Sequence, residues 1–134
     1  MERILRFFSL DRLYNYAGMA GGLLAGALGG WDVPVKILVG AMALDYFSGV
    51  MVAVREKTLS SAVGFHGLAR KLMVFLMIMM AAGLDRLTGQ EGACRSAAVL
   101  FYFVNEAVSL MENAAKLGLS LPEKLTDVLA QLKK

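Results

Sequence analysis

Residues Val33–Val54, VPVKILVGAMALDYFSGVMVAV, form a long apolar segment in which only Lys36 and Asp45 carry a charge. A helix needs about 20 mainly apolar residues to cross the hydrocarbon core of a bilayer. The stretch meets that length. Lipid offers no partner to backbone amides and carbonyls, so a helix is the expected spanning form. We therefore interpret residues 33–54 as a membrane-spanning helix.

Three further apolar blocks flank this stretch. The first, residues 14–31, contains no charge, and the third, Leu72–Leu84, is uncharged but short. Arg70 and Lys71 can lie inside a longer third span if their charged groups reach the membrane surface. The fourth block contains polar residues. We expect four spanning helices at about 14–31, 33–54, 68–87 and 95–113, or three if one block does not cross.

Composition favours a membrane protein over a soluble one. Apolar residues make up 57% of the 134 residues, charged residues 19%, and the mean hydropathy is +0.59. A soluble helical bundle would need a charged stripe on each helix, and the blocks at 14–31 and 72–84 have none. A signal peptide is an alternative for the first block, because Ala25-Gly26-Ala27 resembles a cleavage motif. Its long charged lead favours a retained helix.

The basic residues predict the orientation. With four spans and an inner N-terminus, 11 of the 14 Lys and Arg residues lie inside and 3 lie outside, namely Lys36, Arg86 and Arg95. Positively charged segments preferentially stay on the cytoplasmic side. If the first block does not cross, the N-terminus moves outside and the split weakens to 8 against 6. We expect a multi-pass protein with both termini in the cytoplasm.

Glycines recur at every fourth position of the first block, and a helix would place them along one face. They are Gly18, Gly22, Gly26 and Gly30. Small residues at this spacing let two membrane helices approach closely. The face suits self-association in an oligomer and packing against another helix of the same chain equally well.

Polar residues of the fourth block fall within an arc of about 120° on a helical wheel. They are Tyr102, Asn105, Glu106, Ser109, Glu112, Asn113 and Lys116. Asp45 is a further acid within the second block. A charge at the bilayer centre costs about 2.5–3.5 kcal/mol, so Asp45 is expected to face water or a basic residue of another helix. The stripe could line a multimeric pore, contact another helix or lie at the membrane surface.

Two segments outside the apolar blocks are expected on the cytoplasmic side. Residues 55–67 are predicted to form a basic turn that includes His66, because their glycines disfavour one long helix. Gly118 can end the fourth helix, and residues 120–134 can form an amphipathic helix. The chain is thus predicted to be one all-α domain, 1–134, with three to four transmembrane helices and a C-terminal amphipathic helix.

The sequence contains no recognisable catalytic or metal-binding set. The single cysteine, Cys94, excludes an intrachain disulfide, and the single histidine excludes a histidine-rich metal site. Glu106 and Glu112 lie at opposite edges of the polar stripe, unlike a paired acid and base. We expect no enzyme activity, no cofactor and no nucleic-acid partner.

Several strings, taken in their order and spacing, resemble a known family. They are Asp45-Tyr46-Phe47-Ser48-Gly49, Ser60-Ser61-x-x-Gly64-x-x-Gly67, Arg70-Lys71, Asp85 and Phe101-Tyr102-Phe103-Val104-Asn105-Glu106, followed by Ser109, Glu112-Asn113, Leu117-Gly118, Pro122 and Leu125. Over about residues 44–132 the chain resembles the toxin-secretion and phage-lysis group of phage holins.

The resemblance implies a function in the bacterial inner membrane. Holins of this group collect there as homo-oligomers and open lesions that release an endolysin or a toxin, without required direct contact with it. Members are often described with about three spans. The polar stripe and Asp45 would then line the lesion. Two alternatives stay open, namely a small ion channel or transporter subunit, and a structural membrane subunit that forms no pore.

Overall fold

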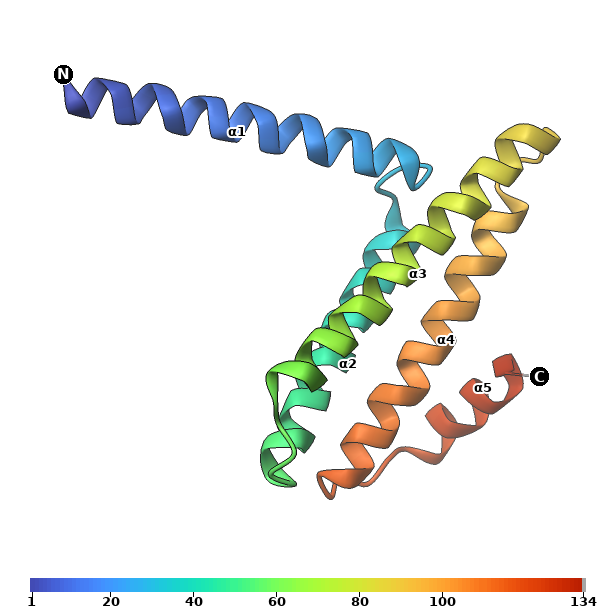
Figure 1. Ribbon diagram of the computed structural model, residues 1–134. Coiled ribbons are helices and arrows are strands. Elements are labelled where there is room, and N and C mark those ends of the chain that lie inside the picture. Colours follow the sequence, from blue (N-terminus) through green and yellow to red (C-terminus); the bar gives the residue numbers. More distant parts are fainter. Residues whose placement is uncertain (134) are drawn as a thin grey trace.

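The computed structural model describes residues 1–133, apart from the side chains of Phe8 and Lys133. All regular structure in this part of the chain is helical (Figure 1). The helices are α1 Glu2–Ala27, α2 Val33–Arg55, α3 Ser61–Thr88, α4 Ala93–Lys116 and α5 Glu123–Lys133. The all-α prediction is therefore confirmed.

Side chains that accept backbone hydrogen bonds set the starts of α2 and α3. The carboxylate of Asp32 accepts from the amide of Val35 at 3.3 Å, and the hydroxyl of Ser60 accepts from the amide of Val63 at 3.2 Å. Such caps satisfy amides that have no partner within the helix. At the other end of α3, Gly89 takes a φ of 70°, the left-handed conformation that ends many helices.

Helices α2, α3 and α4 lie alongside one another and alternate in direction, while α5 turns back along α4 (Figure 1). Helix α4 packs against both α2 and α3, whereas α2 and α3 touch each other over a shorter stretch. Helix α1 projects away from this three-helix bundle and contacts it only at α3. Most of α1 is therefore uncovered by the chain itself.

The apolar core lies in one half of the bundle, near the α1–α2 loop and the α3–α4 turn. It is formed by Leu28, Val35, Leu38, Met42, Ile78 and Val99. Outside this core many large apolar side chains point outward, among them Phe47 at 66% and Leu87 at 86% exposure. By length and composition, α2 and α3 could each cross a membrane. The outward apolar surface is what lipid would cover.

Two boundaries differ from the prediction. Helix α3 begins at Ser61, so Gly64, His66 and Gly67 lie within the helix and not in a basic turn. The Ser60 cap starts the helix at Ser61. The helix then includes Gly64 and Gly67, because Tyr46 packs against both. Gly30 lies outside α1 with a φ of 119°, because the chain leaves the helix after Ala27. The predicted helical glycine run therefore ends at Gly26.

Candidate functional site

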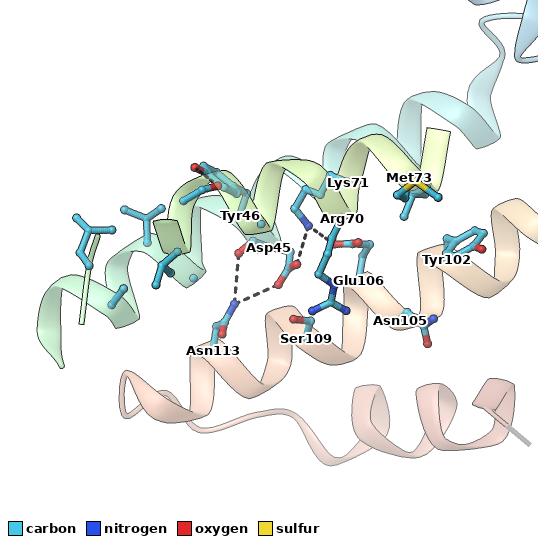
Figure 2. A pocket seen from close by; sticks show the side chains of 18 of the residues that line it. Asp45, Tyr46, Arg70, Lys71, Met73, Tyr102, Asn105, Glu106, Ser109 and Asn113 are labelled. Atoms are coloured by element: carbon cyan, nitrogen blue, oxygen red, sulfur yellow. Dashed lines mark hydrogen bonds and ion pairs between the residues drawn. The ribbon is translucent and has the colours of Figure 1, made fainter. Parts of the chain in front are cut away.

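Three charged side chains from three helices meet near the middle of the bundle (Figure 2). The ammonium of Lys71 on α3 lies 2.8 Å from a carboxylate oxygen of Asp45 on α2 and 2.7 Å from one of Glu106 on α4. Their side chains are only 11–15% exposed. Charge-assisted hydrogen bonds of this length are strong. We call these residues the charged triad, which carries one net negative charge when all three groups are ionised.

Asn113 and Ser48 extend the triad toward the end of the bundle where α2 and α4 finish. The amide nitrogen of Asn113 donates to a carboxylate oxygen of Asp45 at 3.1 Å and to the hydroxyl of Ser48 at 2.9 Å. Ser48 in turn donates to the backbone carbonyl of Asp45 at 3.0 Å. Within the described residues no buried side-chain nitrogen or oxygen lacks a partner. The polar groups are thus satisfied inside one chain.

A cleft of about 480 Å³ opens beside the triad between α2, α3 and α4. Asp45, Lys71, Glu106 and Asn113 contribute to its wall, with Arg70 also among its lining residues. Tyr46, Tyr102, Asn105 and Ser109 add further polar groups (Figure 2), and the rest of the lining is glycine or apolar. The apolar wall residues are Val50, Ala53, Leu59, Val63, Met73, Val74 and Met77. This cleft is the candidate functional site.

Two glycines of α3 allow the ring of Tyr46 to pack against the helix backbone. A Cβ atom at Gly67 would lie 3.3 Å from a ring carbon of Tyr46, and one at Gly64 would lie 3.4 Å from its hydroxyl. That hydroxyl donates to the carbonyl of Gly64 at 3.4 Å. These small residues, spaced by three, therefore form the close contact between α2 and α3.

A second polar cluster fixes the opposite end of the bundle. The guanidinium of Arg95 on α4 pairs with Asp32 at 2.7 Å and donates to the carbonyls of Leu28 and Gly30 in the α1–α2 loop. The hydrogen bond from Arg95 holds the pKa of the Asp32 carboxyl below its usual value. Arg86 donates to the carbonyl of Gly26 at 2.7 Å. The end of α1 is thus fastened to α3 and α4.

The structure brings most of the predicted polar stripe to the cleft. Residues Tyr102, Asn105, Glu106, Ser109 and Asn113 line it together with Asp45. Glu112 is exposed and is not among the lining residues. The expected basic partner of Asp45 from another helix is confirmed as Lys71.

The glycine face of α1 is open apart from the hydrogen bond of Arg86 to the carbonyl of Gly26. At Gly18, Gly22 and Gly26 an added Cβ atom would meet nothing within 4 Å. Within the described residues no other helix covers the face at these positions, and the role of the glycines in helix packing stays a prediction.

Lys71 is the functional candidate that the sequence patterns did not identify. It was expected to reach the membrane surface beside Arg70, but its ammonium turns inward to the two carboxylates. The available signal was a basic residue on a neighbouring helix at a depth comparable to Asp45. The Gly64–Gly67 pair was also missed, because it was assigned to a turn.

Comparisons with known proteins agree with this membrane architecture. The family model for the bacteriophage holin family matches residues 22–134. An uncharacterized 14.9 kDa protein in the nagH 3′ region of Clostridium perfringens is 36% identical over 128 residues, covering 92% of this chain and 97% of that protein. A Listeria monocytogenes protein, Lmo0128, is 33% identical over 129 residues, covering 96% and 86%.

A phage protein is also among the relatives. The probable holin of Bacillus phage phi105 is 36% identical over 84 residues, covering 63% of this chain and 62% of that protein. No solved structure gives a significant match. The family match covers most of the sequence, including α2, α3, α4 and α5. The chain therefore belongs to the bacteriophage holin family, and its two long apolar helices fit a membrane protein of that family.

Proposed function

We propose that this protein oligomerises in the bacterial inner membrane and forms lesions through which an endolysin or a toxin leaves the cytoplasm. The observation that carries the proposal is the charged triad beside the polar cleft, because two of its members, Asp45 and Lys71, lie on α2 and α3, which are long and apolar enough to cross a bilayer. Ionisable groups inside membrane segments are costly and usually face a bundle interior or a water-filled path. Family membership supports a holin-like, non-enzymatic role.

The cleft supports lesion formation because its polar residues are not spread over the surface. Glu106, Ser109 and Asn113 lie on the side of α4 that faces α2 and α3, and Asn105 lies at the exposed edge of that side. A wall of this kind can line water once several copies place it toward a common centre. We propose that the stripe residues of α4 that lie at the cleft, together with Asp45, become the lining of the lesion.

Helix α1 supports assembly of several copies. Its glycine face, Gly18, Gly22 and Gly26, is uncovered, and large side chains such as Leu23 at 75% exposure surround it. An apolar helix of this kind needs lipid or protein around it. We propose that this face packs against a second copy within the membrane.

The topology that we propose has α2, α3 and α4 crossing the membrane, with the C-terminus in the cytoplasm. The division of 11 inner against 3 outer basic residues favours a cytoplasmic N-terminus, which requires α1 to cross as well. The helix α5 would then begin at the inner surface and pack back along the cytoplasmic end of α4. Its Leu129 is buried, while Leu125, Val128 and Leu132 are 47–48% exposed and can contact lipid.

The test is induced expression in a bacterium that carries a cytoplasmic endolysin and a large cytoplasmic reporter enzyme. Membrane potential is followed with a fluorescent dye while release of the reporter into the medium is assayed. We expect sudden loss of potential followed by reporter release, and no lysis when the endolysin is absent. Unchanged potential at confirmed membrane insertion would contradict the proposal and favour a structural subunit.

The second candidate function is a small cation channel, favoured by one observation. The triad carries two carboxylates against one ammonium, and a net negative charge in a narrow polar path attracts cations. A channel of this kind would lower the potential and retain the reporter. The two readouts of the same experiment therefore separate the candidates.

A further inference from the structure

We propose that Lys71 is an electrostatic clasp that keeps the N-terminal half of α3 closed over the polar side of α4. Exposing that side then requires breaking both ion pairs of Lys71. The inference rests on the proposed function, because it describes the closed state from which a lesion would form. It assigns control of that state to a residue outside the polar stripe.

The two halves of α3 are held to the bundle in different ways. In the C-terminal half, Ile78, Ala81 and Ala82 are 1–7% exposed and pack in or beside the apolar core. Large apolar side chains point outward from both halves, but none of the buried residues of α3 lies in its N-terminal half, residues 61–74. Close apolar packing resists separation far more than a few edge contacts do. The C-terminal half is therefore the fixed end about which the N-terminal half can move.

Few interactions other than those of Lys71 hold the N-terminal half. Tyr46 packs on Gly67 and donates to the carbonyl of Gly64 at 3.4 Å, which is long for a hydroxyl donor. Lys71 forms two of the three ion pairs among the described residues, at 2.7 and 2.8 Å. The stronger attachment of this half to α2 and α4 is therefore ionic.

Loss of the Lys71 ammonium would replace attraction within the triad by repulsion. Asp45 and Glu106 would remain as two partly buried carboxylates without their shared cation. Like charges in a shielded site repel, and an unpaired charge there favours any arrangement that admits water. The cleft already lets water reach the edge of the triad, and movement of α3 away from α4 would expose both carboxylates more fully. The triad therefore works as a two-state element with a closed and an open arrangement.

Arg70 is the natural control for Lys71, because it carries the same charge at the preceding position. Its side chain is exposed at the cleft, and it takes part in none of the three ion pairs of the described residues. Removing its charge leaves the two pairs of Lys71 intact. A general effect of lost positive charge on α3 would thus appear equally in both variants.

The test measures access to the cleft directly, independently of lesion formation. In a Cys94→Ser background, Ser109→Cys places a single thiol on the cleft wall. The protein is reconstituted in lipid nanodiscs and reacted with a charged maleimide that does not enter lipid. We expect Lys71→Met to label at least about tenfold faster, since removing one partner of a buried pair shifts a two-state equilibrium by more than that. Arg70→Met should label like the parent.

Two additional variants keep the inference testable if Lys71→Met does not accumulate. Glu106→Gln keeps one ion pair and should label at an intermediate rate. The neutral triple variant Asp45→Asn, Lys71→Met, Glu106→Gln removes the repulsion and should regain much of the protection. Equal labelling of Lys71→Met and Arg70→Met, or no protection in the triple variant, would overturn the clasp.

The same variants tested in cells distinguish this inference from the proposed function. At matched membrane levels, Lys71→Met should lose membrane potential earlier after induction than Arg70→Met. If the parent protein never lowers the membrane potential, the proposed function is wrong. The labelling rates still show whether Lys71 holds α3 against α4. If the parent lowers it and both variants follow the parent in timing and labelling, only the clasp fails.

Discussion

The carboxylate of Asp85, near the end of α3, accepts the backbone amide of Arg95, in the first turn of α4, at 2.9 Å. Its other oxygen accepts the amide of Cys94 at 2.9 Å. Asp85 thus caps α4, whose own N-cap residue, Gly92, has no side chain to accept these hydrogen bonds. A single residue joins the last turn of α3 to the first turn of α4, and it is 5% exposed.

Replacing Asp85 should therefore loosen the α3–α4 turn. We expect Asp85→Ala to lower the melting temperature of the detergent-solubilised protein by several degrees, because two amides at the helix start lose their acceptor. Glu91→Ala is the matched control, since Glu91 is an exposed acid of the same turn. Circular dichroism at increasing temperature measures both. Equal melting of the two variants would argue against the cap.

Gly29 should not tolerate a side chain. It has a φ of 84°, and an added Cβ atom would lie 2.7 Å from the Nε atom of Arg95. The backbone conformation alone costs an L-residue roughly 1–2 kcal/mol, and Arg95 would have to leave the α1–α2 loop. We expect Gly29→Ala to lower the free energy of unfolding by at least that amount. Gly18→Ala, in the open helix α1, should not lower it.

The contact between Gly67 and Tyr46 should show coupling in a double-mutant cycle. We expect Gly67→Leu to destabilise the bundle by about 1–3 kcal/mol, because the new side chain overlaps the tyrosine ring. Tyr46→Ala should relieve much of this cost, so that the double variant is more stable than the sum of the single effects predicts. Denaturant unfolding in micelles supplies the four free energies. Simple additivity would contradict close packing at this point.

The Asp32–Arg95 pair should contribute to stability in a pH-dependent manner. The pKa of Asp32 is lower in the folded chain than its usual value of 3.8, chiefly because Arg95 donates to the carboxylate. The contribution is therefore complete above pH of about 4 to 5 and is lost as the pH falls through the lowered pKa. Melting temperatures of the parent and Asp32→Asn should differ at pH 7 and converge toward pH 2. A constant difference would contradict this origin.

Glu106 and Glu112 should differ in their effect on lesion formation. Glu106 lines the cleft and is 9% exposed, whereas Glu112 is exposed and lies outside the cleft lining. We expect Glu106→Leu to abolish loss of membrane potential while membrane insertion persists, and Glu112→Leu to retain activity within about threefold, as for a surface substitution. Potential-sensitive dye fluorescence after induction measures both. Loss in both variants would mean that the whole stripe acts as one surface.

The sequence alone predicted the helical class, because long apolar blocks leave a membrane helix as the ordinary solution. It also predicted that Asp45 needs a basic partner, because an unpaired charge in such a block is costly. The helical wheel placed Glu106 and Asn113 on one side of α4, and both lie at the cleft. These predictions needed only the length, charge or residue spacing of a single segment, and no knowledge of how the helices are arranged.

Interactions between helices were harder to predict from the sequence. The helical wheel could not separate Glu112 from the cleft-lining residues, because its angle lies within the same arc. Which residues of that arc line the cleft depends on where α2 and α3 pack against α4. Lys71 was assigned to the membrane surface, because sequence proximity to Arg70 said nothing about the direction of its side chain. The start of α3 at Ser61 was missed for a different reason. The Ser60 cap and the Tyr46 contact outweigh the low helix propensity of Gly64 and Gly67.

The position of the charged triad near the middle of α2 and α4 links this protein to the lipid composition of its host. In a bilayer with short acyl chains, water and headgroups come closer to Lys71, and separating its ion pairs becomes less costly. Long or tightly ordered chains move the polar surface away and strengthen the closed arrangement. Host strains that differ in acyl-chain length should therefore lose their membrane potential at different times after the same protein has accumulated to the same level.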